Sequence, residues 1–183
     1  MFGGNAAHTQ VYQSSFNGQP KEFAWSFKTG GAVRSTPLFS DGRVFFGSAD
    51  KNFYAIDSKN GDLIWKIETG GAVNSSAALD EKGSLFFLSD DNNLYCVNSA
   101  NGSITWKFKT GKDLAYRWGF DYLQSSPTVD GDAVYFGSGD GFLYAIDKTN
   151  GTTGWKFDAG NRVRSSAAVS GNKIFFGDMG GNF

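Results

Sequence analysis

One short segment recurs three times in this sequence, and it limits what the chain can fold into. The copies read AIDSKNGDLIW at Ala55–Trp65, CVNSANGSITW at Cys96–Trp106 and AIDKTNGTTGW at Ala145–Trp155. Asn-Gly stands in the middle of each copy, and this pair favours the positive φ angles of a tight hairpin turn. Each copy therefore predicts two strands joined by a tight turn, with a Trp on the second strand. A hairpin with one large aromatic side chain at a fixed place, repeated along a chain, predicts a stack of like units.

The repeating unit is longer than this segment. Trp25, Trp65, Trp106 and Trp155 lie 40, 41 and 49 residues apart, and a similar series follows each of them. The series has a glycine-containing turn, then a Ser-Ser or Ser-Thr pair, and then an aromatic run such as RVFFGS or AVYFGS. β-Branched and aromatic runs of this length, bounded by Gly and Asp, are typical of strands. A period near 40 with four strands in each unit is typical of a β-propeller blade.

Within one blade we expect four strands, ordered from a central channel outward. In the first complete blade they are Val33–Phe39, Arg43–Gly47, Phe53–Ile56 and Leu63–Glu68. Because successive strands run in opposite directions, the Asp-Gly and Asn-Gly turns should lie on one face, here called the turn face. The other loops and the links between blades should lie on the opposite face, here called the loop face.

The whole chain then has a simple predicted organisation. We expect an irregular lead-in over residues 1–22 and an all-β propeller of about four four-stranded blades over residues 23–183. The predicted units are 23–62, 63–103, 104–152 and 153–183, the last of them incomplete. We expect every repeated Trp to be buried between neighbouring units, since large aromatic side chains dominate buried area.

Composition argues against several classes of function. A net charge of -1 gives no general attraction to nucleic acid or to an anionic membrane. No apolar run is long enough to span a bilayer, and the start MFGGNAAHTQ lacks the parts of a signal peptide. Cys96 is the single cysteine, so an internal disulfide is excluded and we expect a buried structural thiol.

The best candidates for a binding site lie on the loop face. Polar residues occupy one equivalent position of all four units, just before the serine pair: Arg34, Asn74, Gln124 and Arg164. They would form part of a ring at the mouth of the channel. The alternative is that they are simply solvated or pair with nearby Asp residues.

A second candidate is an insert in the third unit. The link Lys112–Leu123 is longer than the matching links and is rich in side chains that are enriched at protein interfaces. The residues proposed to bind are Arg117, Trp118, Asp121 and Tyr122. Binding residues concentrate on loops held by a rigid scaffold, so we expect this insert to contact a partner. The alternative is that it only covers a hydrophobic edge.

Catalytic and metal-binding patterns are weak in this sequence. His8 is the only histidine, and it lies in the lead-in. The acidic clusters Asp90–Asn93 and Asp130–Asp132 lack the ligand spacing of a calcium loop. We attribute the Asp-Gly pairs at Asp41 and Asp140 to turn geometry alone. We therefore assign no catalytic, cofactor-binding or metal-binding residue.

Taken together, the repeats resemble the PQQ-like β-propeller repeat family. The pattern A-x-D-x-x-N-G-x-x-x-W is similar to that family's tryptophan-docking motif, carried here by Ala55, Asp57, Asn60, Gly61 and Trp65. A second copy has the same five residues at Ala145, Asp147, Asn150, Gly151 and Trp155. The middle copy departs from the pattern, with Cys96 for the Ala and Asn98 for the Asp.

The resemblance implies a fold more strongly than a function. Family propellers usually have seven or eight blades, so we expect this chain to be a fragment of about half a ring. A compact ring completed by the Trp25 strand, or two copies paired into eight blades, are the alternatives. The family includes quinoprotein alcohol dehydrogenases, the outer-membrane assembly lipoprotein of the BAM complex and sensor parts of kinases. Most members are exported, which favours the periplasm or the cell surface.

The expected function is a non-catalytic scaffold or sensor that binds a protein or peptide on the loop face. The alternative is a fragment of a PQQ-dependent dehydrogenase whose active site lies outside this segment. In those enzymes the resemblance would bring adjacent cysteines, a calcium site and a catalytic Asp. This chain has one cysteine, so we expect no PQQ or calcium in this segment. A small-ligand or glycan sensor that uses the channel mouth is a weaker possibility.

Overall fold

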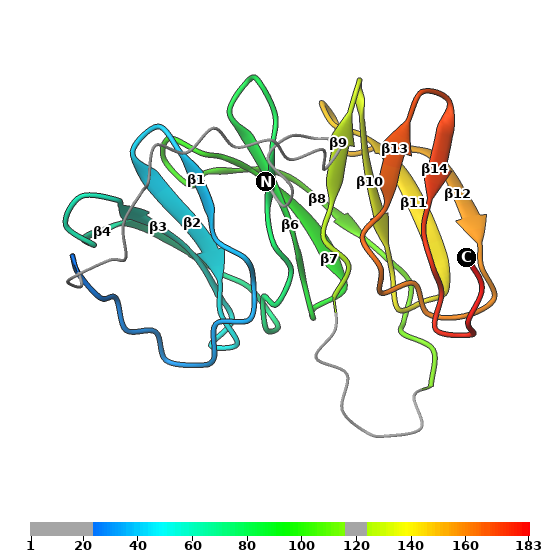
Figure 1. Ribbon diagram of the computed structural model, residues 1–183, viewed down its shortest axis with the longest axis horizontal. Helices are drawn as coiled ribbons and strands as arrows, with labels where there is room; N and C mark the ends of the chain where they lie inside the picture. The colour runs from blue at the N-terminus through cyan, green and yellow to red at the C-terminus, as the bar shows by residue number, and fades with distance from the viewer. Residues whose placement is uncertain (1–23, 116–123) are drawn as a thin grey trace, which may run out of the picture.

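Four antiparallel sheets follow one another along the chain and stand side by side in sequence order (Figure 1). The computed structural model describes residues 24–115 and 124–183, and in these residues every regular element is a β-strand. The all-β propeller architecture predicted from the repeats is therefore confirmed.

Each of the first three sheets has four strands in chain order, and the described part of the fourth has two. The first sheet contains β1 (Leu38–Ser40), β2 (Arg43–Gly47), β3 (Asn52–Asp57) and β4 (Leu63–Glu68). The second contains β5 (Ala78–Leu79), β6 (Ser84–Ser89), β7 (Asn93–Asn98) and β8 (Ile104–Lys109). The third contains β9 (Thr128–Asp130), β10 (Ala133–Gly137), β11 (Phe142–Asp147) and β12 (Thr153–Asp158). The fourth contains β13 (Ala168–Ser170) and β14 (Lys173–Phe175).

The order of the strands from the inside to the outside agrees with the prediction. The short first strands contact one another, because β9 touches both β5 and β13. Ser58 N donates to Gly42 O on the turn face, which joins the hairpin turns of the first sheet. Ala49 N donates to Ala32 O on the loop face, which joins the link before the sheet to the loop between β2 and β3. The hairpin turns that follow β9 and β13 point to the upper edge of Figure 1.

The first strand of the blade is shorter than predicted. We expected Val33–Phe39, but β1 begins only at Leu38. The reason is that a side chain replaces the backbone ladder, since Ser35 Oγ accepts from Gly47 N at 2.9 Å and donates to Gly47 O at 3.0 Å. Pro37 has no N–H to donate in any case. The second and fourth strands match the prediction, and β3 is one residue longer at each end.

The repeated serine pair connects each sheet internally and to its neighbour. The first hydroxyl bonds within its own sheet, as Ser35 does. The second hydroxyl accepts from a backbone N–H of the preceding sheet. These bonds run from Thr36 N to Ser76 Oγ (2.8 Å), from Ser76 N to Ser126 Oγ (3.0 Å) and from Ser126 N to Ser166 Oγ (2.9 Å). A chain of hydroxyl bonds therefore runs along the inner strands from one sheet to the next.

The repeated Trp joins each sheet to the next at the outer side. Trp65 in β4 lies opposite Ala55, packs on Phe45, and donates from Nε1 to Ser99 O of the second sheet at 3.2 Å. Its indole lies against Gly102, whose φ is 73° and where a Cβ atom would come within 2.8 Å of the ring. Trp25 and Trp106 make the same contacts with the turns of the first and third sheets. The expected position between units is confirmed for these three residues, although each is half-buried and not fully buried as predicted.

Trp155 departs from this expectation, because 43% of its surface is exposed. Trp155 occupies the same position on the third sheet as Trp65 does on the first, and its ring centroid lies 5.9 Å from that of Tyr135. The described part of the fourth sheet, however, has only two strands and no Asn-Gly turn on which the indole could dock. The prediction of a core position was therefore wrong for Trp155.

Cys96 lies in the core of the second sheet, as expected. It is opposite Trp106, in the place that Ala55 and Ala145 take elsewhere, and 1% of its surface is exposed. Burial raises the pKa of its thiol to about 12, and the nearby Asp80 charge adds to this. The thiol therefore stays protonated and unreactive at neutral pH.

Replacing Trp65 with Ala tests the contribution of this contact. We expect the variant to lose about 3–5 kcal/mol of unfolding free energy, because a large ring is removed from between two sheets. Trp155→Ala is the matched control and should lose clearly less, since no turn covers that ring. Urea denaturation followed by far-UV circular dichroism measures both. Equal losses for the two variants would contradict the assignment.

Candidate functional site

A hollow of about 150 Å³ opens on the loop face where the second and third sheets meet. It is bounded by the loops that follow β6 and β10, by the link after β8, and by Arg164 from the link before β13. Its lining is mostly polar and includes Asp90, Asn92, Gln124 and Ser125. Two loops and two interblade links thus bring hydrogen-bonding groups to one place.

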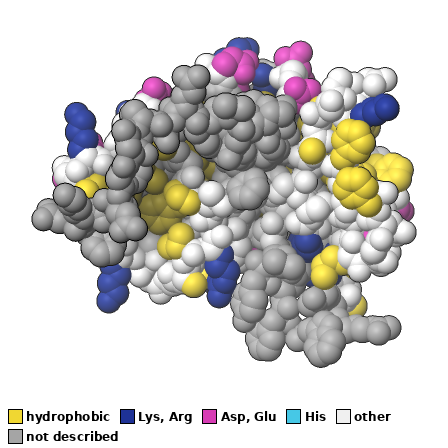
Figure 2. All heavy atoms as spheres, viewed as in Figure 1, with side chains coloured by type: hydrophobic (Ala, Val, Ile, Leu, Met, Phe, Trp, Pro, Cys, Tyr) yellow, Lys and Arg dark blue, Asp and Glu magenta, His cyan; other side chains and the backbone are white. Residues whose placement is uncertain are grey.

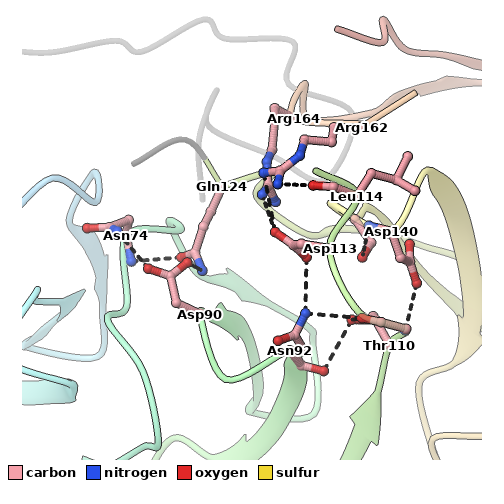
Figure 3. Close-up of polar contacts among 12 residues, drawn as sticks. Asn74, Asp90, Asn92, Thr110, Asp113, Leu114, Gln124, Asp140, Arg162 and Arg164 are labelled. Atoms are coloured by element: carbon pink, nitrogen blue, oxygen red, sulfur yellow. Dashed lines mark hydrogen bonds and ion pairs between the residues drawn. The ribbon is translucent and has the colours of Figure 1, made fainter. Parts of the chain in front are cut away.

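Asp113 stands at the centre of the polar contacts beside this hollow (Figure 3). Its Oδ2 accepts from Arg164 Nη2 at 2.6 Å and from Arg162 Nη1 at 3.5 Å, while its Oδ1 accepts from Asn92 Nδ2 at 3.0 Å. Arg162 also donates to the carbonyl oxygen of Leu114. Both arginine side chains are largely buried, at 10% and 13% exposure, so these ion pairs are partly shielded from water. Asp113 therefore ties the link after β8 to the second sheet and to the link between β12 and β13.

Gln124 fixes the other end of the same link. Its Oε1 accepts from the backbone N–H groups of Asn74 and Ser75 at 2.8 and 2.9 Å. Its Nε2 donates to Asp90 Oδ1 at 2.5 Å, and Asn74 Nδ2 also points to the Asp90 carboxylate, at 3.4 Å. Both ends of the long link are therefore held by side-chain hydrogen bonds to neighbouring loops.

The structure brings some of the predicted rim residues together. Gln124 and Arg164 line one hollow, and Asn74 contacts Gln124 but is itself buried. Arg34 is exposed on the first sheet and is not among the residues that line this hollow. Of the two interpretations of these polar residues, pairing with Asp describes Gln124 and Arg164. Arg117, Trp118, Asp121 and Tyr122 lie outside the described residues.

Two groups of residues in the structure were not predicted from the sequence. Asp113 and Arg162 carry no repeat signal, because only the third unit has the long link. The second group is an Asp–Tyr pair that recurs four residues apart. The Tyr hydroxyl donates to the carboxylate in the pairs Asp50–Tyr54 (2.7 Å), Asp91–Tyr95 (2.5 Å) and Asp140–Tyr144 (2.6 Å).

Each of these carboxylates also holds the link that precedes its sheet. Gly30, Gly70 and Gly111 donate their backbone N–H groups to the three Asp residues at 2.8, 2.9 and 2.7 Å. Asp140 had been attributed to turn geometry alone, which was incomplete, since its carboxylate bridges a link and a strand. The recurrence of Asp four residues before Tyr was the available sequence signal.

The hydrogen bonds keep the carboxylates of Asp50 and Asp91 ionised. Burial raises the pKa of Asp91, but the bonds from Tyr95, Asn93 and Gly70 together outweigh it and hold that pKa below its usual value. The pKa of Asp50 is lowered in the same way, by Tyr54, Gly30 and Asn52 against the effect of burial. Burial and the Asp50 charge raise the pKa of Tyr54 to about 12. The Asp50–Tyr54 and Asp91–Tyr95 pairs are therefore each an anion with a neutral phenol at neutral pH.

Within residues 24–115 and 124–183, no group of three or more His, Cys, Asp or Glu side chains is placed to hold a metal ion. The same part of the chain contains no helix that is long and apolar enough to cross a membrane. Asp90 and Asp91, from one of the two acidic clusters in the sequence, are engaged in the bonds described above.

Comparisons with known proteins agree with this architecture. A protein-family model described as outer membrane protein assembly factor BamB matches residues 9–79 and 61–183. BamB from Moraxella catarrhalis has a similar structure, with a TM-score of 0.69 and 15% identity. The computationally designed Ika4 protein has a TM-score of 0.71 and 16% identity, over 88% of this chain and 95% of that chain. A search of curated proteins found no match.

A quinohemoprotein alcohol dehydrogenase, ADHIIG from Pseudomonas putida HK5, is also similar, with a TM-score of 0.62 and 25% identity. The match covers 74% of this chain and 22% of the dehydrogenase. The match to the Moraxella BamB covers 85% of this chain and 46% of that structure. The chain therefore spans about half the length of that relative, and the likeness to the structures under 25% identity shows the fold alone.

The Asp–Tyr pairs predict a specific pH dependence. The pKa of Asp91 is lower in the folded state, so its stabilising effect is present above the unfolded value near 4 and is lost as pH falls through the folded pKa. Tyr95→Phe should cost about 1.5–3 kcal/mol at pH 7, the usual value of a hydrogen bond to a charged group. The difference from the unchanged protein should shrink as pH is lowered from 5 towards 2.

Tyr135→Phe provides a control, since Tyr135 makes a ring contact with Trp155 and its pKa is raised mainly by burial. Its effect on unfolding free energy should not change over that acidic range. Urea denaturation at a series of pH values measures both variants. A Tyr95→Phe difference that is constant with pH would argue against the carboxylate pair.

Proposed function

This chain belongs to the PQQ-like β-propeller family whose model is described as outer membrane protein assembly factor BamB, and from that premise we propose that it is a binding scaffold. The binding surface is the rim of the loop face around the hollow between the second and third sheets. The partner is a protein or peptide, and the site of action is the cell envelope. The description of the family as an outer membrane protein assembly factor supports the envelope location.

The observation that carries the proposal is the anchored base of the long link. Asp113, at the start of this link, is bound by Arg164 at 2.6 Å and by Asn92 at 3.0 Å, while Gln124 at its end is bound to the second sheet. Both described ends of this long link are thus fixed by partly buried polar contacts beside a polar hollow. Loops held in this way on a rigid scaffold are the usual place for binding residues.

The chemistry of the rim indicates what it can bind. Asp90, Asn92, Gln124 and Ser125 provide donors and acceptors at the hollow. In the link, Arg117, Trp118, Asp121 and Tyr122 supply the aromatic and charged side chains that dominate binding energy at protein interfaces. Arg34 and Arg164 extend the proposed surface along the inner ends of the other blades, and the buried Asn74 helps to hold Gln124 in place. A peptide segment with both apolar and polar side chains matches this mixture.

A fragment of a quinoprotein dehydrogenase is the second candidate, favoured by the 25% identity with the enzyme from Pseudomonas putida HK5. The described residues do not fit PQQ with calcium. Cys96 is the only cysteine and is enclosed in the second sheet, so it cannot face a bound quinone. The carboxylates of Asp50 and Asp91 are occupied by Tyr and Gly donors. In this second candidate the PQQ site would therefore lie outside this segment.

Photo-crosslinking in cells tests the proposed surface. A photoreactive amino acid at Lys112, an exposed position at the start of the link, should give a discrete crosslinked product with the partner. The same amino acid at Lys59, on the turn face, should give none. Combined replacement of Arg117, Trp118 and Tyr122 with Ala should reduce the Lys112 product at least tenfold and leave the melting temperature unchanged. We expect this because those side chains would supply most of the binding energy.

Lys59→Ala combined with Thr149→Ala is the matched control, because both residues are exposed on the turn face. This control should leave the Lys112 product unchanged. An equal product from Lys59, or a Lys112 product that persists in the triple variant, would remove the link from the proposed binding surface.

A further inference from the structure

Three exposed Asn-Gly turns on the turn face carry a chemical property that the binding proposal does not use. The asparagine side chains of these turns, Asn60, Asn101 and Asn150, are all exposed, and a glycine follows each of them directly. Figure 2 shows charged side chains along the upper edge of the molecule, the edge to which hairpin turns of this face point in Figure 1. Water therefore reaches the three side-chain amides.

An Asn-Gly pair can modify itself without an enzyme. The backbone nitrogen of the glycine attacks Cγ of the asparagine and forms a new C–N bond. The bond from Cγ to Nδ2 breaks, and ammonia leaves with the proton of the glycine N–H. Water then opens the resulting succinimide ring at one of its two carbonyl groups, which gives either aspartate or isoaspartate. Glycine permits this ring closure readily, because it has no side chain and the widest choice of backbone angles.

In the folded chain both reacting groups are held in hydrogen bonds. Each glycine N–H donates to the carbonyl oxygen three residues before the asparagine, at 2.8 Å for Gly102 and at 2.9 Å for Gly61 and Gly151. Each asparagine Oδ1 accepts from the N–H two residues after it, at 3.1 Å for Asn60 and at 2.9 Å for Asn101 and Asn150. Ring closure requires these bonds to break, so only a locally opened turn can react.

The docked Trp opposes this local opening. The indole of Trp65 lies against Gly102, where ring atoms come within 2.8 Å of the place of a Cβ atom, and its Nε1 donates to Ser99 O of the same turn at 3.2 Å. Trp106 lies in the same way against Gly151. When opening and closing are fast relative to the reaction, the rate follows the population of the open turn. The Trp contact therefore sets the rate at which the turn is modified.

We propose that the three Asn-Gly turns are sites of spontaneous deamidation and isoaspartate formation, and that the Trp docked on each turn keeps its site closed. Modification also acts back on the contact. Isoaspartate at position 101 adds one methylene group to the main chain directly before Gly102, so the glycine no longer meets the Trp65 ring in the same register. A junction between two sheets that stays open long enough is then altered permanently. These sites lie on the face opposite the proposed binding surface and do not depend on it.

Peptide mapping by mass spectrometry during incubation at neutral pH follows all three turns in one sample, with isoaspartate and aspartate peptides separated by chromatography. In Trp65→Ala the modification of Asn101 should be at least about tenfold faster than in the unchanged chain, because only this turn loses its indole. Asn60 and Asn150 in the same molecule should change by less than about twofold, since their indoles remain in place.

Trp106→Ala is the matched control, because it removes the indole from the next turn along the chain. It should accelerate Asn150 at least about tenfold and leave Asn60 and Asn101 within about twofold of the unchanged chain. Equal acceleration of all three asparagines in either variant would overturn the proposal, because it would show that unfolding of the whole chain, and not the local contact, controls the reaction.

Two further measurements keep the test decisive if an alanine variant does not fold. Trp65→Phe keeps a ring on Gly102 but lacks the Nε1 donor, so it should fold and accelerate Asn101 by about two- to tenfold, the factor that corresponds to one neutral hydrogen bond. A free peptide of residues 97–104, VNSANGSI, should react at least about tenfold faster than the same residues in the folded chain. An unchanged rate at Asn101 in a folded Trp65 variant, or equal rates in the peptide and the folded chain, would also overturn the proposal.

Discussion

The contact between one Trp and the Asn-Gly turn of the next sheet is the interaction on which the rest of the structure depends. Each four-stranded sheet is too small to bury its own outer face, so its last strand must find a neighbour. Trp65 does this by laying its indole on Gly102 and by donating a hydrogen bond to Ser99 O. Glycine is required at position 102 for two reasons: its φ angle is 73°, and a side chain would collide with the Trp65 ring. Trp155 occupies the equivalent position on the third sheet, but no Asn-Gly turn of the described residues covers it, and its side chain is exposed.

Much of the scaffold could be predicted because it repeats. The Trp period and the Asn-Gly turns predicted both ends of β2 and β4 correctly. The first strand was predicted too long because Ser35 replaces backbone pairing with its side chain, which no local pattern shows. The candidate site was less predictable. Asp113 and Arg164 form an ion pair although they belong to two different interblade links. Only the third unit has this arrangement, so the sequence contains no repeated pattern that could predict it.

The candidate binding surface arises from a departure from the repeat. At the rim, an unusually long link between blades is fixed by Asp113 and Gln124 beside a polar hollow. The regular units around it make this link recognisable, because their matching links are shorter.

A double-mutant cycle between Trp65 and Gly102 tests the central contact most directly. The unfolding free energies of Trp65→Ala, Gly102→Ala and the double variant are measured in urea. The nearest atoms to a Cβ at Gly102 all belong to Trp65, so removing the ring should relieve part of the cost of Gly102→Ala. We predict a coupling of at least about 0.5 kcal/mol, typical of residues in contact. Additive losses, within about 0.3 kcal/mol, would show that the two residues act independently and would contradict the account.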